Sequence, residues 1–441
     1  MPSGKFDIII AGGGISGAAI ALFLSHLNTN VTILESRPSR TTSAEGGILM
    51  LAPNGMHVLN GLDLAHKLLQ RDSGIQVPCL TINDPAGGLI GKVPQGSVER
   101  YGFASTMVMR WDIHEVLLDE VERSCLNVRW NAQVNATEES DDGVIVYWTE
   151  HGLPKYKKVD LLIGADGIWS AARPSVFKCL GLSAPEPTYS GLVSMGTILD
   201  VDCIPGFYGF LSPERPCVMI HGRKGFIGMA LFDKQGKKVG WWTTHEAADR
   251  FREEWRIPKE QAFREMRERY SDLAFPVPQL IAAAEASGDQ PFIWPVFEVE
   301  KLGHWHSKRT VLVGDAAHAM PPHSGQGTSQ SLEDAGYLAY LLRQYLEKSS
   351  STKGFDVENL TSTLATYQAS RQPRVDAIIE EANRQGSQKK KHGAVGWFMK
   401  KWMMKIVFLF MQESWSDGWF GYRVPGIEEW AALRASTSTR G

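Results

Sequence analysis

The sequence predicts an α/β fold in which one domain is built from both ends of the chain and a mixed β-sheet domain is inserted between them. Three observations predict it. A strand–helix–strand pattern fills the first 35 residues, β-rich runs separated by turns occupy the middle, and a strand followed by long helical stretches returns near residue 310. The 441 residues, of which 43% are hydrophobic and 22% charged, are enough for two such domains around substantial cores.

The first element is a glycine-rich turn between a predicted strand at residues 7–11 and an Ala-rich helix. Its spacing is Gly12-x-Gly14-x-x-Gly17, in which the first glycine permits a tight turn, the second lets the backbone approach a pyrophosphate, and the third lets the helix pack closely on the sheet. The helix N-terminus favours negative charge. The second strand, "NVTILE", ends at Glu35, which can accept hydrogen bonds from ribose hydroxyls. The pattern therefore predicts a Rossmann-like dinucleotide site.

The middle of the chain contains β-rich runs, and "GRKG" at 222–225 predicts a hairpin turn between two of them. A helical pattern follows at 258–273, and strand character returns in "RTVLVGD". A long helix is expected to begin near Ser329, and a further C-terminal helical region is expected to be interrupted at Pro373. These patterns predict a discontinuous nucleotide-binding domain (1–75, 100–180 and 290–385), a substrate-binding β-sheet domain (76–99 and 181–289) and a C-terminal helical segment (386–441).

Composition excludes some classes of protein. The net charge of −3 argues against bulk electrostatic attraction to nucleic acid. The five cysteines are scattered and odd in number, without a CxxC motif, which predicts reduced thiols in an intracellular, cytoplasmic protein and no metal site. The apolar run near the N-terminus is broken by three consecutive glycines, so we do not interpret it as a signal peptide.

Three further stretches carry chemistry. "MRWDIHEVLL" places Arg110 at the start of an amphipathic helix. "DLLIGADGIWSAAR" runs from an apolar strand into Asp166-Gly167 and ends at Arg173. "VGDAAHAMPPHSGQGTSQ" has Asp315 directly after the glycine that ends a strand, then a Pro-Pro corner, then a Gly-x-Gly segment.

In this order, and together with the glycine fingerprint, these motifs resemble the single-component (class A) FAD-dependent aromatic monooxygenases of the para-hydroxybenzoate and salicylate hydroxylase type. The resemblance spans roughly residues 5–380. It implies a monooxygenase that uses NAD(P)H and O2, by way of a flavin C4a-hydroperoxide, to hydroxylate a phenolic or aromatic carboxylate substrate, with loss of CO2 where the attack is ipso to a carboxylate. Because one GxGxxG motif is present, NAD(P)H is expected to bind transiently as a co-substrate.

The resemblance also implies which residues bind FAD. Arg110 would reach the pyrophosphate or ribityl region, Asp315 would bind the ribityl chain, and the amides near Gly327 and Thr328 would face the pyrimidine edge of the flavin. Asp166-Gly167 would form the family's shared FAD/NAD(P)H motif, with Arg173 as a supporting ion partner. The full implied set is Gly12, Gly14, Ser16, Gly17, Glu35, Arg37, Gly47, Ile48, Arg110, Asp166, Asp315, Gly327 and Thr328.

One departure from the family pattern concerns the end of the last motif. A related pattern reads Gly-x-Asn there, whereas this chain has Gly327, Thr328 and Ser329. We expect the Ser329 hydroxyl to cap the helix that follows.

Catalytic candidates are harder to place. His221 lies on the same face of the strand 217–221 as Cys217, where it is suited to deprotonate a phenol, although a position next to a turn is equally compatible with exposure to solvent. Tyr208 is a second candidate, and Pro322 would form a wall without an amide proton beside flavin C4a. We interpret His318 as a packing residue that bonds to the backbone.

The stretch "WFMKKWMMKIVFLFM" at 397–411 has two interpretations, a lid over the substrate pocket or a helix that lies in a bilayer interface. Two alternative functions also stay open. One is a flavin-dependent epoxidase or other oxygenative tailoring enzyme, and the other is a reductase or dehydrogenase without oxygen insertion. Neither the substrate nor the choice between NADPH and NADH follows from the sequence.

Overall fold

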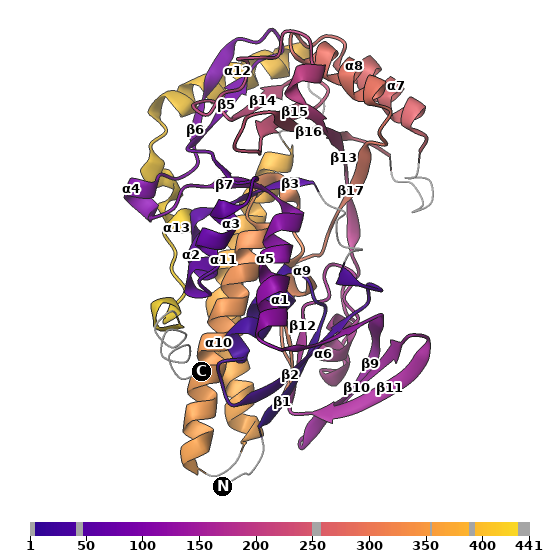
Figure 1. Cartoon of the computed structure of the whole chain (residues 1–441), viewed down its shortest axis with the longest axis vertical. Helices are drawn as coiled ribbons and strands as arrows, with labels where there is room; N and C mark the ends of the chain where they lie inside the picture. The colour runs from indigo at the N-terminus through magenta and orange to yellow at the C-terminus, as the bar shows by residue number, and fades with distance from the viewer. Residues whose placement is uncertain (1–4, 41–46, 249–256, 353–354, 388–392, 431–441) are drawn as a thin grey trace.

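The two ends of the chain meet in one parallel sheet, as the sequence predicts (Figure 1). The computed structural model describes residues 5–40, 47–248, 257–352, 355–387 and 393–430. The strand order is β18-β12-β1-β2-β8, and each neighbouring pair runs parallel. Ala11 lies level with Leu34 and Gly164, so three strands end together at the edge where open α/β sheets bind ligands. The strands are β1 (Phe6–Ala11), β2 (Thr29–Glu35), β8 (Asn127–Trp130), β12 (Leu161–Gly164) and β18 (Thr310–Leu312).

Helices pack around this sheet. Every residue of α1 is buried because its side chains are small or apolar, and it packs between α5 and α10. Two small antiparallel sheets flank the main sheet, one with the order β11-β10-β9 and one with the order β3-β7-β4. Their strands are β3 (Ile48–Leu51), β4 (Ile75–Gln76), β7 (Thr106–Met109), β9 (Ala132–Ser140), β10 (Gly143–Glu150) and β11 (Leu153–Val159). The helices of this part are α1 (Ile15–Leu24), α2 (Pro53–Gly61), α3 (Ala65–Gln70), α4 (Val98–Tyr101), α5 (Arg110–Arg123), α6 (Arg173–Cys179), α9 (Asp315–His318), η4 (Pro322–Ser324), α10 (Gly327–Thr352) and α11 (Val357–Ser387).

The expected interruption at Pro373 is wrong, because α11 continues through it. A proline inside a helix costs about 3 kcal/mol through a lost hydrogen bond and a clash with the preceding turn. Here Arg371 and Arg374, on either side of the proline, bind Glu333 and Asp334 of α10. These buried ion pairs hold the helix on its neighbour and offset that cost.

The inserted domain is a seven-stranded mixed sheet with the order β17-β13-β16-β15-β14-β5-β6, in which only β14 and β5 run parallel. The predicted hairpin is confirmed: His221 pairs with Phe226, and the Gly222 N–H donates to the Gly225 carbonyl at 2.9 Å. The predicted domain boundaries stay a prediction, and the pairing of β17 carries this sheet as far as residue 298. The strands are β5 (Cys79–Asn83), β6 (Leu89–Pro94), β13 (Thr188–Asp200), β14 (Cys217–His221), β15 (Phe226–Leu231), β16 (Lys238–Glu246) and β17 (Phe292–Glu298), and a short η2 (Val201–Cys203) follows β13.

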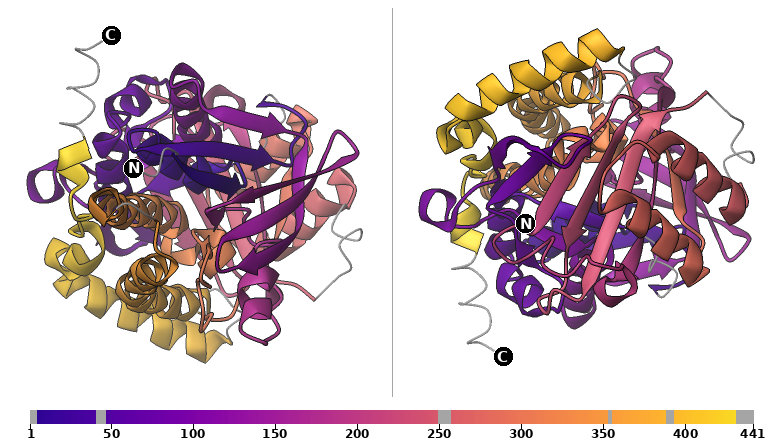
Figure 2. Two further views of the ribbon diagram at one scale, coloured as in Figure 1. Left: turned by 90° about the horizontal axis from the view of Figure 1, so that it is seen from below. Right: turned by 90° about the horizontal axis from the view of Figure 1, so that it is seen from above.

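The two faces of this sheet have different covers (Figures 1 and 2). Helices α7 (Lys259–Tyr270) and α8 (Val277–Ser287) pack on the face that holds Val218 and Ile220. The other face, with Cys217 and Met219, forms an apolar cluster with Met404 of α12 (Ala394–Phe410). Beyond α12 the chain forms η5 (Glu413–Ser416) and α13 (Asp417–Phe420).

Among the described residues, every helix is too short or too polar to cross a membrane.

Candidate functional site

The glycine turn after β1 is shaped by close packing at two positions and by open space at the third. Gly12 has φ +97°, and a Cβ there would lie 2.4 Å from the Ala165 carbonyl oxygen. A Cβ on Gly17 would lie 2.0 Å from the Gly12 carbonyl oxygen. At Gly14, the N-cap of α1, no described atom lies within 4 Å of an added Cβ. A ligand can therefore approach the N-terminus of α1 at Gly14, where the helix favours an anion.

Glu35 ends β2 beside this turn and is 5% exposed. Its Oε2 accepts a hydrogen bond from the Gly13 N–H at 2.6 Å, and its Oε1 accepts from the Arg37 N–H at 2.9 Å and from Arg37 Nε at 3.0 Å. Burial by itself would raise the pKa of Glu35, but the hydrogen bonds and charge of Arg37 lower it below its usual value. An ionised acceptor therefore stands at the end of β2, as the fingerprint predicts.

His114 also binds the turn, and sequence reasoning missed it. Its Nε2 lies 2.7 Å from the Gly13 carbonyl oxygen, and the residue is 2% exposed. Burial, helped by the charges of Arg37 and Arg110, lowers the pKa of His114 to about 4. His114 follows Arg110 by four residues on α5, so the two share a helix face. That spacing within "MRWDIHEVLL" was the available signal.

Arg110 lies near residues from other segments of the chain. Its N–H donates to the Gly47 carbonyl at 3.2 Å, and Ile48 pairs with Met109, which brings the predicted residues Gly47 and Ile48 next to α5. The Arg110 side chain is half-buried, and burial together with the Arg37 charge lowers its pKa, while Asp315 and Glu35 act in the opposite direction. The structure thus brings Glu35, Arg37, Arg110 and Asp315 into one electrostatic neighbourhood.

Asp166 follows β12 and keeps an unused acceptor. Its Oδ2 accepts hydrogen bonds from the N–H groups of Ala171 at 2.7 Å and Ala172 at 3.0 Å, while its buried Oδ1 has no hydrogen-bond partner in the described chain. Burial raises the pKa of Asp166. A buried carboxylate oxygen without a donor is the arrangement expected where a ligand hydroxyl or amide completes the site.

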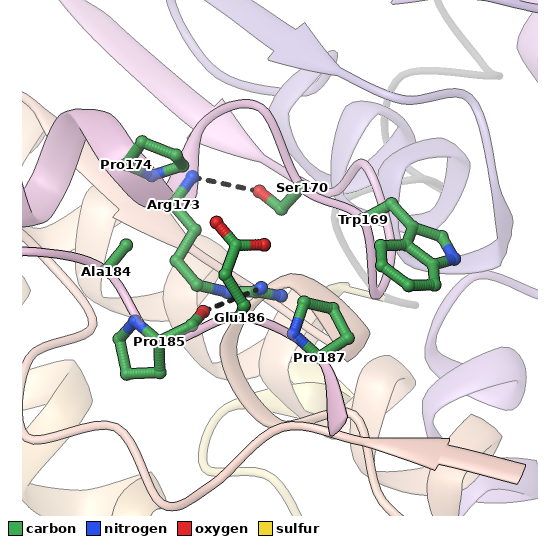
Figure 3. Close-up of a pocket in the computed structure, with 8 residues that line it drawn as sticks. All are labelled: Trp169, Ser170, Arg173, Pro174, Ala184, Pro185, Glu186 and Pro187. Carbon is green, nitrogen blue, oxygen red and sulfur yellow. Dashed lines mark hydrogen bonds between the residues drawn. The ribbon is translucent and has the colours of Figure 1, made fainter. Parts of the chain in front are cut away.

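Arg173 joins two loops of the site. Its Nε donates to the Ala316 carbonyl at 3.0 Å and a terminal nitrogen donates to the Ile168 carbonyl at 2.8 Å, so it ties the Asp166 loop to the turn after β18. Its charge also acts on Asp166 and Asp315, while its expected role as a supporting ion partner in the FAD site stays a prediction. Figure 3 shows the recess beside it. This recess is lined by Trp169, Ser170, Arg173, Pro174, Ala184, Pro185, Glu186 and Pro187.

Asp315 opens α9 directly after Gly314, whose φ is +60°. Dense protein surroundings raise the pKa of Asp315, and the charges of His318, Arg110 and Arg173 oppose that rise. Its side chain is nevertheless exposed. An exposed carboxylate at this position is accessible to a ligand, as the expected role of Asp315 requires.

A buried ion network supports this turn from behind. Asp334 accepts hydrogen bonds from the Gly314 N–H at 2.9 Å and from Arg371 Nε at 2.8 Å, and its Oδ2 lies 2.5 Å from His318 Nε2. Burial would raise the pKa of Asp334, but His318 and Arg371 lower it to about 2. His318 is structural, as expected, but its partner is this carboxylate rather than the backbone. Asp334 and Glu333 were not found from the sequence, because their partners come from other segments.

The predicted Pro-Pro corner and Gly-x-Gly segment lie at the start of α10. Pro322 is exposed, and no described atom lies within 4 Å of a Cβ added to Gly327, which with Thr328 begins the helix. Ser329 is fully buried, and its Oγ accepts a hydrogen bond from the Ala52 N–H at 3.2 Å. The expected cap is therefore corrected: this hydroxyl binds the residue before α2 and holds that segment against α10.

The structure places the catalytic candidates His221 and Tyr208 in different environments. His221 is 8% exposed, ends β14 beside the apolar cluster, and its ring centroid lies 5.6 Å from that of Phe226. Tyr208 is 91% exposed at the surface, so the structure does not bring it to the predicted pocket. It lies in a turn-rich segment outside the named strands, where "GFYGF" does not form part of the sheet.

These features fit FAD. The open positions at Gly14 and Gly327 lie at helix N-termini, and the unpaired Asp166 Oδ1 and the exposed Asp315 follow the neighbouring strands β12 and β18. A family model described as "FAD binding domain" matches residues 5–382. The chain belongs to this FAD-binding family. Ser16, which is buried, and the remaining implied FAD residues stay predictions as individual contacts.

Relatives of this family member have named activities. The 3-amino-4-hydroxybenzoate 2-monooxygenase PtnB3 of Streptomyces platensis is 30% identical over 340 residues, which cover 76% of this chain and 79% of the relative. The FAD-dependent monooxygenase paxM of Penicillium paxilli is 28% identical over 403 residues, which cover 87% of this chain and 77% of the relative. The chain is accordingly a flavin monooxygenase with FAD as its cofactor.

Solved structures share the fold. Klebsiella pneumoniae HpxO complexed with FAD and uric acid superimposes with a TM-score of 0.75 at 20% identity, over 91% of this chain and 93% of that chain. A salicylate hydroxylase substrate complex also gives a TM-score of 0.75 at 20% identity, over 97% of this chain and 98% of that chain. The predicted fold class is confirmed.

Proposed function

We propose that this flavin monooxygenase uses NAD(P)H and O2 to hydroxylate a phenolic or aromatic carboxylate substrate. The observation that carries the proposal is the relative that is 30% identical, because its name describes an aromatic carboxylate with a ring hydroxyl as substrate. A second relative, the 6-hydroxynicotinate 3-monooxygenase of Bordetella bronchiseptica, is 25% identical and its name also describes a hydroxylated aromatic acid.

The apolar cluster on the inner face of the inserted sheet supports a site for the aromatic ring. It joins residues beside Arg110 on β3 and β7 to residues of the seven-stranded sheet. Such surroundings exclude water from the reacting atoms. We place the substrate at this cluster. The residues used here are Ile48, Met50, Met109, Cys217, Met219 and Trp242.

Different residues of this chain would have different roles in the reaction. Bound FAD would accept a hydride from NAD(P)H and activate O2. The turn from Gly12 to Gly17 would bind the pyrophosphate, and Glu35 would orient the ribose. Asp315 would hold the ribityl chain, and the Pro321-Pro322 corner, which has no amide proton, would shield the reacting oxygen. The oxygenated-flavin route expected from the sequence stays a prediction.

His221 is our proposed base for the substrate hydroxyl. It ends β14 on the edge of the apolar cluster, and an imidazole can take a proton near neutral pH. His221→Gln should lower kcat for a phenolic substrate and leave flavin content unchanged. An unchanged pH profile of kcat in this variant would assign the base to another residue.

A screen of phenolic acids with the purified holoenzyme tests the proposed function. NADPH and NADH oxidation would be followed with each acid, and product mass would be measured. A gain of one oxygen indicates simple hydroxylation, and the same gain with loss of CO2 indicates decarboxylative hydroxylation. Oxidation of NAD(P)H without oxygen in any product would contradict the proposal and favour a reductase.

The second candidate is the alternative expected from the sequence, a flavin-dependent epoxidase or other oxygenative tailoring enzyme. Alignments with the Penicillium monooxygenases cover 87% of this chain, whereas the alignment with PtnB3 covers 76%. Including compounds with an alkene in the same screen distinguishes the two, because an epoxide gains one oxygen without a new phenol.

A further inference from the structure

The outward face of α12 is a continuous apolar stripe. Nine large apolar side chains between Val395 and Phe410 are 39–78% exposed. The middle of the stripe repeats at helical spacing and contains Phe398, Met399, Trp402, Met403, Ile406 and Val407. A helix of 17 residues is about 25 Å long, so these side chains form an extended apolar surface rather than isolated exposed residues.

None of the charged residues of α12 belongs to the apolar stripe. Lys400 is 7% exposed and its ammonium lies 5.5 Å from the ring centroid of Trp397, while Lys401 donates to the Asp84 carboxylate at 2.5 Å. Lys405 is half-buried, 5.3 Å from the ring centroid of Trp402. A helix at a protein–water boundary normally turns its apolar face inward and its charges outward. In α12 the large apolar side chains face outward instead, as they would in contact with an apolar phase.

The two segments outside the described residues that lie nearest to α12 in the sequence offer little to cover this stripe. Residues 388–392 read QKKKH and residues 431–441 read AALRASTSTRG, so neither segment carries a matching set of large apolar side chains. In Figures 1 and 2 α12 lies along the periphery of the molecule, tangential to its surface.

The composition of α12 indicates a lipid surface rather than a protein. The helix contains three lysines and no acidic residue, and three more lysines, 389–391, precede it in the sequence. Exposed tryptophans at positions 402 and 415 add the aromatic type that is enriched at membrane interfaces. Cationic, acid-free helices with an apolar face and tryptophan bind in the interface of anionic bilayers.

We propose that the outward face of α12 binds a lipid surface with anionic headgroups, with the helix axis parallel to that surface. The apolar stripe enters the boundary between headgroups and acyl chains, and Lys405, which lies beside Trp402 at the edge of the stripe, meets lipid phosphates. This docking is independent of the identity of the substrate.

Vesicle cosedimentation of the full-chain holoenzyme tests the proposal, with phosphatidylcholine vesicles and with vesicles that also contain phosphatidylserine. The wild type should sediment with the mixed vesicles, and less so at high salt. The double variant Phe398→Glu/Ile406→Glu should bind at least about tenfold more weakly, because two charges enter the apolar boundary. The matched control is Leu153→Glu, which changes a side chain that is 60% exposed on β11 and should bind like the wild type.

Flavin absorbance and thermal unfolding of the double variant show whether it is folded, and both should match the wild type. Equal vesicle binding by the double variant and the wild type would overturn the proposal. So would a wild type that binds no vesicle. Light scattering without vesicles gives the remaining outcome: a dimer that the double variant abolishes would show that the stripe is an interface between copies of this chain, and would also overturn the proposal.

Discussion

Lowering the pH should destabilise the folded enzyme through His114, the histidine that binds the glycine turn. In the folded protein burial lowers its pKa from 6.5 to about 4, so between these values the folded state holds a neutral imidazole while the unfolded chain takes up a proton. The unfolded state therefore binds more protons in this window, and stability falls as the pH falls from about 6.5 towards 4. With these two pKa values, His114 makes the free energy of unfolding at about pH 5 about 2 kcal/mol lower than at neutral pH.

The assay is urea-induced unfolding of the wild type and of His114→Gln at about pH 7 and about pH 5. Glutamine can still donate to the Gly13 carbonyl but does not titrate, so the variant should lose about 2 kcal/mol less than the wild type between the two conditions. Equal losses of stability in His114→Gln and the wild type would refute the reasoning.

Three further predictions concern the FAD site and its support. Gly17→Ala should prevent folding of the glycine turn, because its Cβ would lie 2.0 Å from a backbone carbonyl oxygen. Gly14→Ala has room for its Cβ, so it should leave the unfolding of the apoprotein unchanged but weaken FAD binding in a fluorescence titration. Asp315→Ala should weaken FAD binding, and wild-type flavin content in the purified variant would contradict its assignment. Asp334→Asn should lower the free energy of unfolding in urea by about 3 kcal/mol, because it breaks a buried ion network. The exposed Glu347→Gln should cost about 1 kcal/mol or less.

Local patterns in the sequence were sufficient for the elements that short-range geometry determines. The strand–turn–helix at Gly12 and the hairpin at 222–225 depend on neighbouring residues, and both were predicted correctly. The position of Arg110 at the start of α5 also followed from its own stretch.

Features that depend on distant partners were not predictable in the same way. His114 binds a carbonyl 101 residues away, and α11 continues through Pro373 because arginines beside it bind carboxylates of α10. Nothing within the local sequence of Ser329 indicates that its hydroxyl binds the Ala52 N–H, which is 277 residues distant. The exposure of Tyr208 likewise depends on how its loop leaves the sheet.

Helix α12 contacts the proposed substrate site on one side and the proposed lipid surface on the other, which affects how a substrate would reach the enzyme. Its inner side chain Met404 belongs to the cluster at which we place the substrate, while its outer stripe is the proposed lipid contact. A helix with its side chains is about 10 Å across. A hydrophobic compound dissolved in the bilayer would therefore be only one helix width from the oxidation site, and its partition coefficient into the membrane, rather than its solubility in water, would govern the concentration that the enzyme meets.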